Sequence, residues 1–297
     1  MAVITNVTTS TSVNDLDQSV FSASIMGYAR ENVVVVPTFR EQMLNADNQE
    51  KIAYFTKWES LAATAHTEGD DKTATEHTTD KATATASQIS VIVAPTDLSG
   101  GKALIQEHAK EMGAAVAVKV DETCAALFPS LSNSVGSTGV DLTIAQFREA
   151  VYTMKANTRR PTGGQKYVAA LDPIQLYDLQ TDAVSDASKA AFFGAGLAKE
   201  MVAGQTLVSN PNNYAGKLFG VEVYESSLVP DTDSSGADVS GAMYIAGHTF
   251  GIATKWLART EFQRVAGAIA SKIVVSSAFG VVAIDGLSGV AINTDAA

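Results

Sequence analysis

The stretch TAHTEGDDKTATEHTTDKATATASQISVIVAP, residues 64–95, decides how the rest of this 297-residue chain is interpreted. It is long and polar and has almost no apolar anchor before Ile89. Loops longer than about a dozen residues without structure of their own are uncommon in compact domains, and they are usually functional or disordered. Threonine and alanine alternate over residues 72–86, which fits an extended β-ribbon that does not pack on its own subunit's core and needs a neighbouring molecule. A flexible surface insertion is the alternative that the pattern leaves open.

A long helix is predicted directly after this stretch, from Thr96 or Asp97 to Phe128. Its apolar residues recur at steps of three or four, the spacing of a helix with one buried face. Pro129 should end it. Gly113 within it costs about 1 kcal/mol relative to alanine, so tertiary packing must hold the helix. The predicted buried stripe consists of Ile105, Ala109, Met112, Val116, Val120, Cys124 and Leu127.

Shorter elements are predicted before and after this helix. Residues 14–30 have the pattern of an amphipathic helix, and residues 33–36, before Pro37, that of a short strand. A new unit is expected to begin near Asp141, after the flexible stretch SLSNSVGSTG at 130–139.

The stretch 64–95 also allows a prediction about stability. Deleting residues 68–85 should leave the subunit folded, because the predicted core does not use them.

Helices and strands are mixed beyond this boundary. Thr143 and Gln146 have the spacing of a capping box at the start of a helix. Residues 167–171 have the pattern of a buried strand, and Asp172 with Pro173 supplies an N-cap and a first-turn proline for the next helix. The remaining β patterns cover residues 217–226, read as one strand entered through Gly220, and residues 244–246, 273–275, 281–284 and 290–292. An α+β fold is therefore predicted, because the regular alternation of a doubly wound fold is missing.

Composition excludes several classes of protein. Its 46% hydrophobic content suffices for a buried core, so the chain is not a disordered protein. The formal charge of −11 argues against a surface that grips nucleic acid through its phosphates. Cys124, the single cysteine, excludes an internal disulfide and is predicted to be a small buried hydrophobe. The N-terminus lacks the pattern of a secretory signal and no stretch has the length of a membrane span, so a soluble protein made in a reducing cytoplasm is expected.

No complete catalytic motif occurs in the sequence. A nucleophile elbow, a zinc-protease H-E-x-x-H and a complete P-loop are all missing. Gly163, Gly164 and Lys166 have the wrong spacing for a P-loop and read as a turn. The run GAG at 194–196 follows two phenylalanines rather than a strand, so it fails as a dinucleotide site. Arg159 and Arg160 could contact a carboxylate of another subunit or a phosphate, or form a solvated turn. No catalytic residue, cofactor-binding residue or cofactor is predicted.

Two acidic groups could bind a hard cation, but neither is predicted to hold a metal. Asp231, Asp233, Ser235 and Gly236 match the first half of a calcium loop, yet the twelfth position is Ala242, where a bidentate glutamate is required. The second group lies within residues 64–95, where solvated charge is the ordinary state and a mobile arm does not pre-position ligands. Its members are His66, Glu68, Asp70, Asp71, Glu76 and His77.

The order of these elements resembles the major capsid proteins of tailed bacteriophages, with the Hong Kong 97-type fold. In that family an N-terminal arm, a long two-stranded E-loop, a spine helix, a peripheral domain and an axial domain follow one another. Residues 26–36 are similar to part of the arm, 64–95 to the E-loop and 98–128 to the spine helix. YVAALDPIQLYDLQTD at 167–182 resembles the opening of the axial domain, GKLFGVEVYESSLVP at 216–230 the strand before that domain returns, and 266–285 the closing peripheral strands.

The resemblance implies an α+β capsid fold divided into five segments. These are 1–60, the N-terminal arm and lead-in; 61–95, the E-loop; 96–140, the peripheral domain with the spine helix; 141–250, the axial domain; and 251–297, the return to the peripheral domain.

The implied function is that of a major capsid protein without catalytic residues, which self-assembles from hexamers and pentamers into the icosahedral head shell around a tailed-phage genome. Some relatives carry a scaffolding extension before the arm, whereas this chain enters the arm almost at once, so a separate scaffolding protein or none is expected. A portal and a decoration protein are further implied partners. Contact with packaged DNA should be weak and non-specific because the subunit is acidic, and no membrane partner is expected.

The implied location is the virion, after synthesis in the cytoplasm of the bacterial host. Two alternatives stay open. An encapsulin-like compartment shell has a similar fold, and it would enclose a cargo enzyme instead of a genome. A soluble metal-dependent enzyme that uses the acidic segments is the alternative from another class of function.

Overall fold

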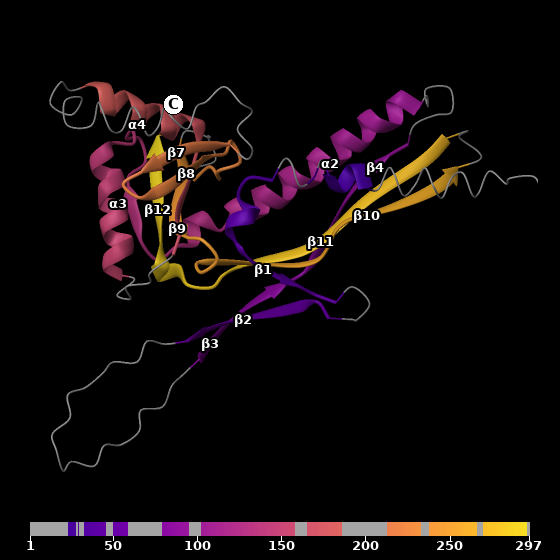
Figure 1. Cartoon of the computed structure of the whole chain (residues 1–297), viewed down its shortest axis with the longest axis horizontal. Coiled ribbons are helices and arrows are strands. Elements are labelled where there is room, and N and C mark those ends of the chain that lie inside the picture. The colour runs from indigo at the N-terminus through magenta and orange to yellow at the C-terminus, as the bar shows by residue number, and fades with distance from the viewer. Residues whose placement is uncertain are drawn as a thin grey trace, which may run out of the picture.

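The computed structural model describes residues 23–27, 29, 33–45, 50–58, 79–94, 102–157, 165–185, 213–232, 238–265 and 270–295. Two β-sheets lie side by side, and the long helix α2 (Lys102–Ala125) runs along one of them towards the other (Figure 1). A ribbon of two strands projects away from both sheets. The predictions for residues 1–22, 59–78 and 186–212 lie outside the described residues.

A four-stranded sheet forms the right-hand part of Figure 1. Its strands lie in the order β1 (Arg40–Met43), β10 (Phe250–Val265), β11 (Ala270–Ala283) and β4 (Ser87–Val93). Strands β10 and β11 form a long antiparallel hairpin, β4 extends it on one edge, and β1 pairs in parallel with residues 251–254 on the other.

Helix α2 packs on this sheet as its apolar stripe predicts. Pro129 lies in a 3₁₀ turn, η2 (Phe128–Ser130), and the α-helix ends four residues before it, at Ala125. The predicted start at Thr96 and the side chain of Ile105 are outside the described residues. The stripe residues Ala109, Met112, Val116, Val120 and Cys124 are at most 1% exposed, and Leu127 is partly buried.

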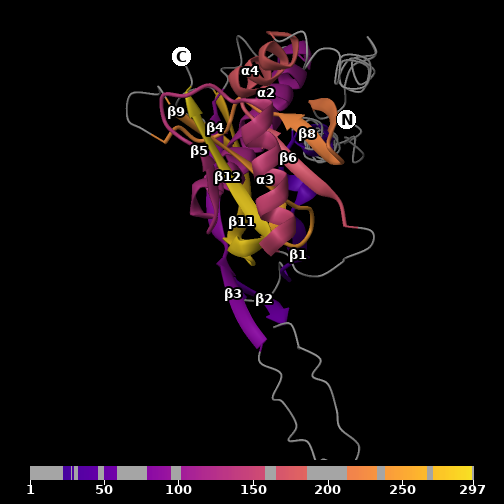
Figure 2. The same cartoon turned by 90° about the vertical axis from the view of Figure 1, so that its left-hand side faces the viewer.

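A six-stranded sheet forms the left-hand part of Figure 1. Helices α3 (Ile144–Asn157) and α4 (Pro173–Ser185) pack against it, and α3 lies in front of it in Figure 2. Because side chains alternate along a strand, Ala169, Met243 and Ile292 face these helices, whereas Val168, Tyr244 and Ala291 join the core around α2. The strand order is β5 (Ser134–Gly136), β12 (Gly289–Asp295), β9 (Asp238–Ile245), β6 (Tyr167–Leu171), β8 (Val221–Glu225) and β7 (Tyr214–Leu218).

Both predicted helix starts in this part of the chain are confirmed. The N–H of Gln146 donates to Thr143 Oγ1 at 3.3 Å, and Gln146 Oε1 accepts the N–H of Thr143 at 2.9 Å, which completes the capping box. At the start of α4, Asp172 Oδ1 accepts the N–H of Ile174 at 3.0 Å, with Pro173 in the first turn. Local hydrogen bonds therefore determine where these helices begin.

Three sequence predictions of local structure are wrong. The stretch 130–139 is not simply flexible, because β5 lies within it and pairs with β12. Residues 217–226 do not form one strand: Phe219 and Gly220 have positive φ angles of 50° and 85° and turn the chain between β7 and β8. The predicted strand at 33–36 is a bend followed by the 3₁₀ turn η1 (Val36–Thr38).

A buried carboxylate explains the bend at 33–36. Asp121 of α2 is fully buried and accepts the N–H groups of Val34 at 2.6 Å, Val35 at 3.2 Å and Val36 at 3.2 Å. Three successive N–H groups that converge on one carboxylate cannot also join a β-ladder. Burial raises the pKa of Asp121, and the three backbone hydrogen bonds offset only part of that rise. The N-terminal segment is thus fastened to α2.

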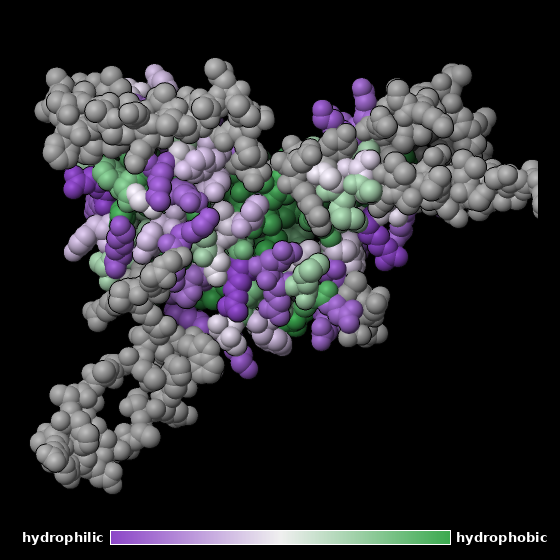
Figure 3. Space-filling model, viewed as in Figure 1, coloured by the Kyte–Doolittle hydropathy of each residue, from purple (hydrophilic) through white to green (hydrophobic). Residues whose placement is uncertain are grey.

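One continuous core joins the two sheets. It contains the stripe of α2, one face of the four-stranded sheet and the inner face of the six-stranded sheet. Phe39, Phe128, Tyr244 and Phe250 meet at its centre, with ring centroids 4.9 to 6.1 Å apart for the pairs in contact. On the side of the molecule that Figure 3 shows, hydrophobic residues lie in the middle of the surface and hydrophilic residues at its flanks. Among the described residues, no helix has the length and apolar character of a membrane span.

Candidate functional site at the base of the ribbon

The ribbon consists of β2 (Ile52–Trp58) and β3 (Thr79–Thr85), paired antiparallel from Ile52 opposite Thr85 to Trp58 opposite Thr79. It extends away from the rest of the subunit in two perpendicular views (Figures 1 and 2). Its strand β3 comes from the threonine–alanine alternation, as predicted, but its partner β2 precedes the stretch 64–95. Only Ala86 separates β3 from β4, so the chain leaves the ribbon and enters the four-stranded sheet without a loop.

The two faces of the ribbon differ in character. On the inner face Ala53, Phe55 and Ala84 are at most 1% exposed, and they form a small core with Leu44 and Ala253. On the outer face Ile52 is 45% exposed and Tyr54 57%. The expectation that the ribbon does not pack on its own subunit is therefore wrong at its base. A deletion of residues 68–85 would remove Ala84 from this core, so the premise that the core does not use these residues is wrong.

Glycines in the four-stranded sheet form the floor on which the ribbon lies. A Cβ atom at Gly251 would come 2.8 Å from Cε1 of Phe55, closer than real carbon contacts allow. A Cβ atom at Gly280 would overlap with the carbonyl of Thr85, where β3 ends. Glycine at these positions lets the Phe55 ring and the backbone at the end of β3 approach the sheet closely. We call this floor, with Phe55 and Ala84 against it, the ribbon seat.

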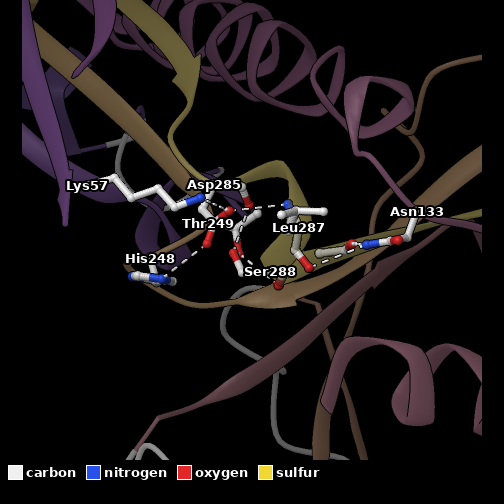
Figure 4. Close-up of polar contacts among 8 residues, drawn as sticks. Lys57, Asn133, His248, Thr249, Asp285, Leu287 and Ser288 are labelled. Atoms are coloured by element: carbon white, nitrogen blue, oxygen red, sulfur yellow. Dashed lines mark hydrogen bonds and ion pairs between the residues drawn. The ribbon is translucent and has the colours of Figure 1, made fainter. Parts of the chain in front are cut away.

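A polar cluster lies next to the seat and connects the ribbon to the rest of the subunit (Figure 4). Nζ of Lys57, on β2, donates to Oδ1 of Asp285 at 2.6 Å. Nε2 of His248 lies 3.6 Å from Oδ2 of the same carboxylate. The N–H of Leu287 donates to Oδ1 at 3.3 Å, so Asp285 also caps the 3₁₀ turn η4 (Gly286–Ser288). One carboxylate therefore joins three segments that are distant in sequence.

Asp285 lies at the corner where the chain passes between the two sheets. The connections from β9 to β10 and from β11 to β12 both pass through this corner (Figure 1). The N–H groups of Ile284 and Asp285 donate to the carbonyl of Thr249 at 2.8 and 3.2 Å. The hydroxyls of Thr249 and Ser288 are 2.8 Å apart and buried, and that of Ser288 also donates to the carbonyl of Asp285. The corner therefore holds the carboxylate in a fixed position.

The electrostatics of Asp285 reflect these contacts. Burial alone would raise its pKa, but hydrogen bonds from His248 and Lys57, the charge of Lys57 and the N–H of Leu287 outweigh burial and lower the pKa to about 2. A carboxyl whose pKa falls on folding stabilises the native state above its ordinary pKa of 3.8, and this contribution disappears as the pH falls towards 2. The site is built for an ionised Asp285.

Replacing Asp285 with asparagine should make the subunit less stable by about 2 kcal/mol at pH 7, the free energy that corresponds to its pKa shift. The difference from the unmodified chain should shrink as the pH is lowered from 4 towards 2. Urea unfolding of isolated subunits at several pH values measures it. Glu111→Gln, a change at an exposed carboxylate of α2, is the matched control and should have almost no effect. A destabilisation that stays constant through the acid range would contradict the assignment.

Among the described residues, those that the sequence singled out do not come together in a catalytic arrangement. Cys124 is buried, as predicted, and burial raises the pKa of its thiol well above the ordinary value. Lys166 and Asp231 lie on the six-stranded side, where Asp231 bridges to Val239. Within the described residues no three His, Cys, Asp or Glu side chains are grouped so that they could hold a metal ion. The other candidates, from His66 to His77 and at 159–164, 194–196, 233, 235 and 236, lie outside the described residues.

The site residues Phe55, Lys57, His248 and Asp285 were not predicted. No clear alternation marked Phe55, because its neighbour Tyr54 and the nearby Ile52 are also large apolar residues. No local signal could have paired Lys57 with Asp285, which are 228 residues apart in sequence.

Comparisons with known proteins give matches in fold and none in sequence. No protein-family model matches the chain, and no curated protein does. The capsid of Ralstonia phage GP4 matches over 91% of both chains, with a TM-score of 0.64 and 12% identity. The mature capsid of bacteriophage PhiM1 matches over 90% of this chain and 86% of its own, with a TM-score of 0.60 and 12% identity. A virus-like particle from Pyrococcus furiosus matches over 92% and 98%, with a TM-score of 0.60 and 6% identity.

These likenesses define the class of fold. The chain has the Hong Kong 97-type capsid fold of tailed-phage capsids, which confirms the predicted α+β fold and the resemblance in element order. The match extends over about 90% of the chain.

Proposed function

We propose that this chain is a major capsid protein that self-assembles into the icosahedral head shell of a tailed bacteriophage. In this proposal it acts in the virion as hexamers and pentamers, contains no catalytic residue and needs no cofactor. A portal, a separate scaffolding protein and a decoration protein are the proposed partners. With a formal charge of −11, its contact with packaged DNA would be weak and non-specific.

The observation that carries the proposal is the exposure of large apolar side chains on the outer face of the ribbon. Ile52 and Tyr54 are about half exposed on a two-stranded ribbon, and Met43, at the end of the neighbouring strand β1, is 75% exposed. The subunit does not need these side chains for its core. Two large apolar side chains on one face of a projecting element, such as Ile52 and Tyr54, are typical of a surface that another molecule covers. In a closed symmetric shell that molecule is a second copy of the chain.

We assign proposed roles to the main segments named above, with β2 added to the E-loop. The ribbon, from β2 and the 61–95 segment, would be the E-loop that overlaps a neighbouring subunit. Residues 96–140 and 251–297, which contain α2 and the β10–β11 hairpin, would form the peripheral domain. Residues 141–250, with α3, α4 and most of the six-stranded sheet, would form the axial domain that surrounds a capsomer axis.

Purified chain, alone and with its scaffolding protein if one exists, should form capsomers or closed shells. Negative-stain electron microscopy and sedimentation velocity measure this directly. A protein that stays monomeric over a wide range of concentration, salt and crowding agent would contradict the proposal. Metal analysis of protein purified without chelator tests the enzyme alternative, since a stoichiometric transition metal would support it.

A compartment shell is the second candidate, because a virus-like particle from Pyrococcus furiosus matches over 98% of its own chain. The contents of particles isolated from the native host distinguish the two. Packaged double-stranded DNA supports a phage head, and a folded enzyme cargo supports a compartment. A terminase gene and a portal gene next to the gene for this chain would also support the phage head.

A further inference from the structure

The ribbon is attached to the rest of the subunit at two separate points. At its base the N–H of Ala86 donates to the carbonyl of Lys51 at 2.7 Å, and the chain continues into β4 over Gly280. The second attachment is Lys57, six residues further along β2 than Lys51. At about 3.4 Å per residue this places it about 20 Å from the base. The apolar seat lies between the two points, under Phe55.

The ion pair of Lys57 and Asp285 is the outermost attachment in the described part of the ribbon. Only Trp58 and Thr79, the residue opposite it, lie further out among the described residues. A two-stranded ribbon is marginally stable alone and does not set its own direction rigidly. The corner, in contrast, fixes Asp285 through η4 and the carbonyl of Thr249. Beyond the apolar seat, the direction of the ribbon therefore depends on the contact with this fixed carboxylate.

We infer that the Lys57–Asp285 ion pair is a lock that fixes the direction of the outer part of the ribbon, and that opening it lets the strands beyond Phe55 bend away from the corner while the apolar seat stays packed. The use of this motion in a shell rests on the proposed function. Subunits at differently curved positions of a closed shell need ribbons at different angles. An ion pair that can open within the subunit would allow the ribbon to take these angles.

The chemistry of the cluster allows the lock to open. The Lys57 side chain is 30% exposed, so its ammonium can return to water without leaving an apolar cavity. Asp285 is not left alone when Lys57 leaves, because the N–H of Leu287 and Nε2 of His248 stay near its two oxygens. Separation of this pair therefore avoids the main penalty for breaking a partly buried ion pair, which is an uncompensated charge. The apolar seat cannot open in the same way, because Phe55 and Ala84 would have to leave the core in which they are buried.

Distances between spin labels on the isolated subunit test the lock directly. Cysteines introduced by Lys81→Cys on the exposed side of β3 and Ala126→Cys after α2 carry the labels. Native Cys124 stays unlabelled because it is buried and the pKa of its thiol is raised. The chain with Lys57 should give one narrow distance distribution by double electron–electron resonance. Lys57→Met should give a broad distribution, because the methionine fills the same space without the charge.

Two further variants distinguish a specific effect of the ion pair from a general loss of rigidity in the ribbon. Lys57→Arg keeps a cation and should restore the narrow distribution. Lys51→Met removes an exposed lysine of the same ribbon that has no bond to Asp285, and it should leave the distribution narrow. If Lys57→Met stays narrow, or if Lys51→Met broadens the distribution equally, the inference is wrong. A broad distribution for Lys57→Arg as well would also overturn it.

Electron microscopy of assembled particles then tests the use of the lock in the shell. Lys57→Met particles should lose the single diameter of the unmodified shell, and Lys57→Arg particles should keep it. If the unmodified chain forms no shells, the proposed function fails while the spin-label result on the lock still stands. If shells form and all variants give the same single diameter, the lock does not set shell geometry.

Discussion

Joining Trp58 to Thr79 through an Asn-Gly turn, in place of residues 59–78, should leave a stably folded subunit that no longer forms shells. Trp58 and Thr79 are directly paired across the ribbon, and a two-residue Asn-Gly turn is the favoured connection between paired antiparallel strands. The ribbon seat and the Lys57–Asp285 pair remain intact in this variant. The part that is removed is the outer part of the proposed E-loop, which together with the outer face of β2 would contact the next subunit.

Thermal unfolding and sedimentation velocity measure the two halves of this expectation. The melting temperature should stay close to that of the unmodified chain, while the sedimenting species should be monomers instead of capsomers or shells. A matched control replaces residues 59–78 with a glycine–serine linker of equal length, which keeps the chain length but changes the sequence. Normal, heat-stable shells from the shortened variant would show that the ribbon does not carry assembly. A subunit that fails to fold would show that 59–78 belongs to the core.

Phe55→Ala should cost about 3–5 kcal/mol of stability, the usual range for a buried phenylalanine. Phe55 is 1% exposed and lies against the glycine floor at Gly251, so the truncated side chain would leave a cavity that rigid sheet backbone cannot fill. The loss should be concentrated in the ribbon. Urea unfolding gives the total, and hydrogen exchange gives the location, with faster exchange expected in β2 and β3 than in α3.

Tyr54→Ala is the control for this change, because Tyr54 is adjacent in sequence, aromatic and 57% exposed on the opposite face. It should change subunit stability by less than about 0.5 kcal/mol but should weaken assembly if a second copy covers the outer face. Equal losses of stability for the two variants would contradict the assignment of inner and outer faces. A small loss for Phe55→Ala would mean that the seat does not hold the ribbon.

The sequence by itself determined the features that depend on neighbouring residues. The stripe from Ala109 to Cys124 predicted which face of α2 is buried, since helical periodicity requires only the local spacing. Thr143 with Gln146, and Asp172 with Pro173, predicted two helix starts because caps are made within one turn. The order of the elements along the chain indicated the capsid fold that the solved structures confirm.

Tertiary structure decided the features that depend on residues distant in sequence. Asp121 bends residues 33–36 away from the predicted strand, because a carboxylate from α2 takes the N–H groups that a sheet would have used. The pairing of β3 with β2, and not within 64–95, brings Phe55 and Ala84 onto the glycine floor. Lys57 meets Asp285 because the ribbon and the corner between the sheets lie together in space. A pattern along the chain records the partners within a few residues, and only the packed structure brings together groups separated by 228 positions.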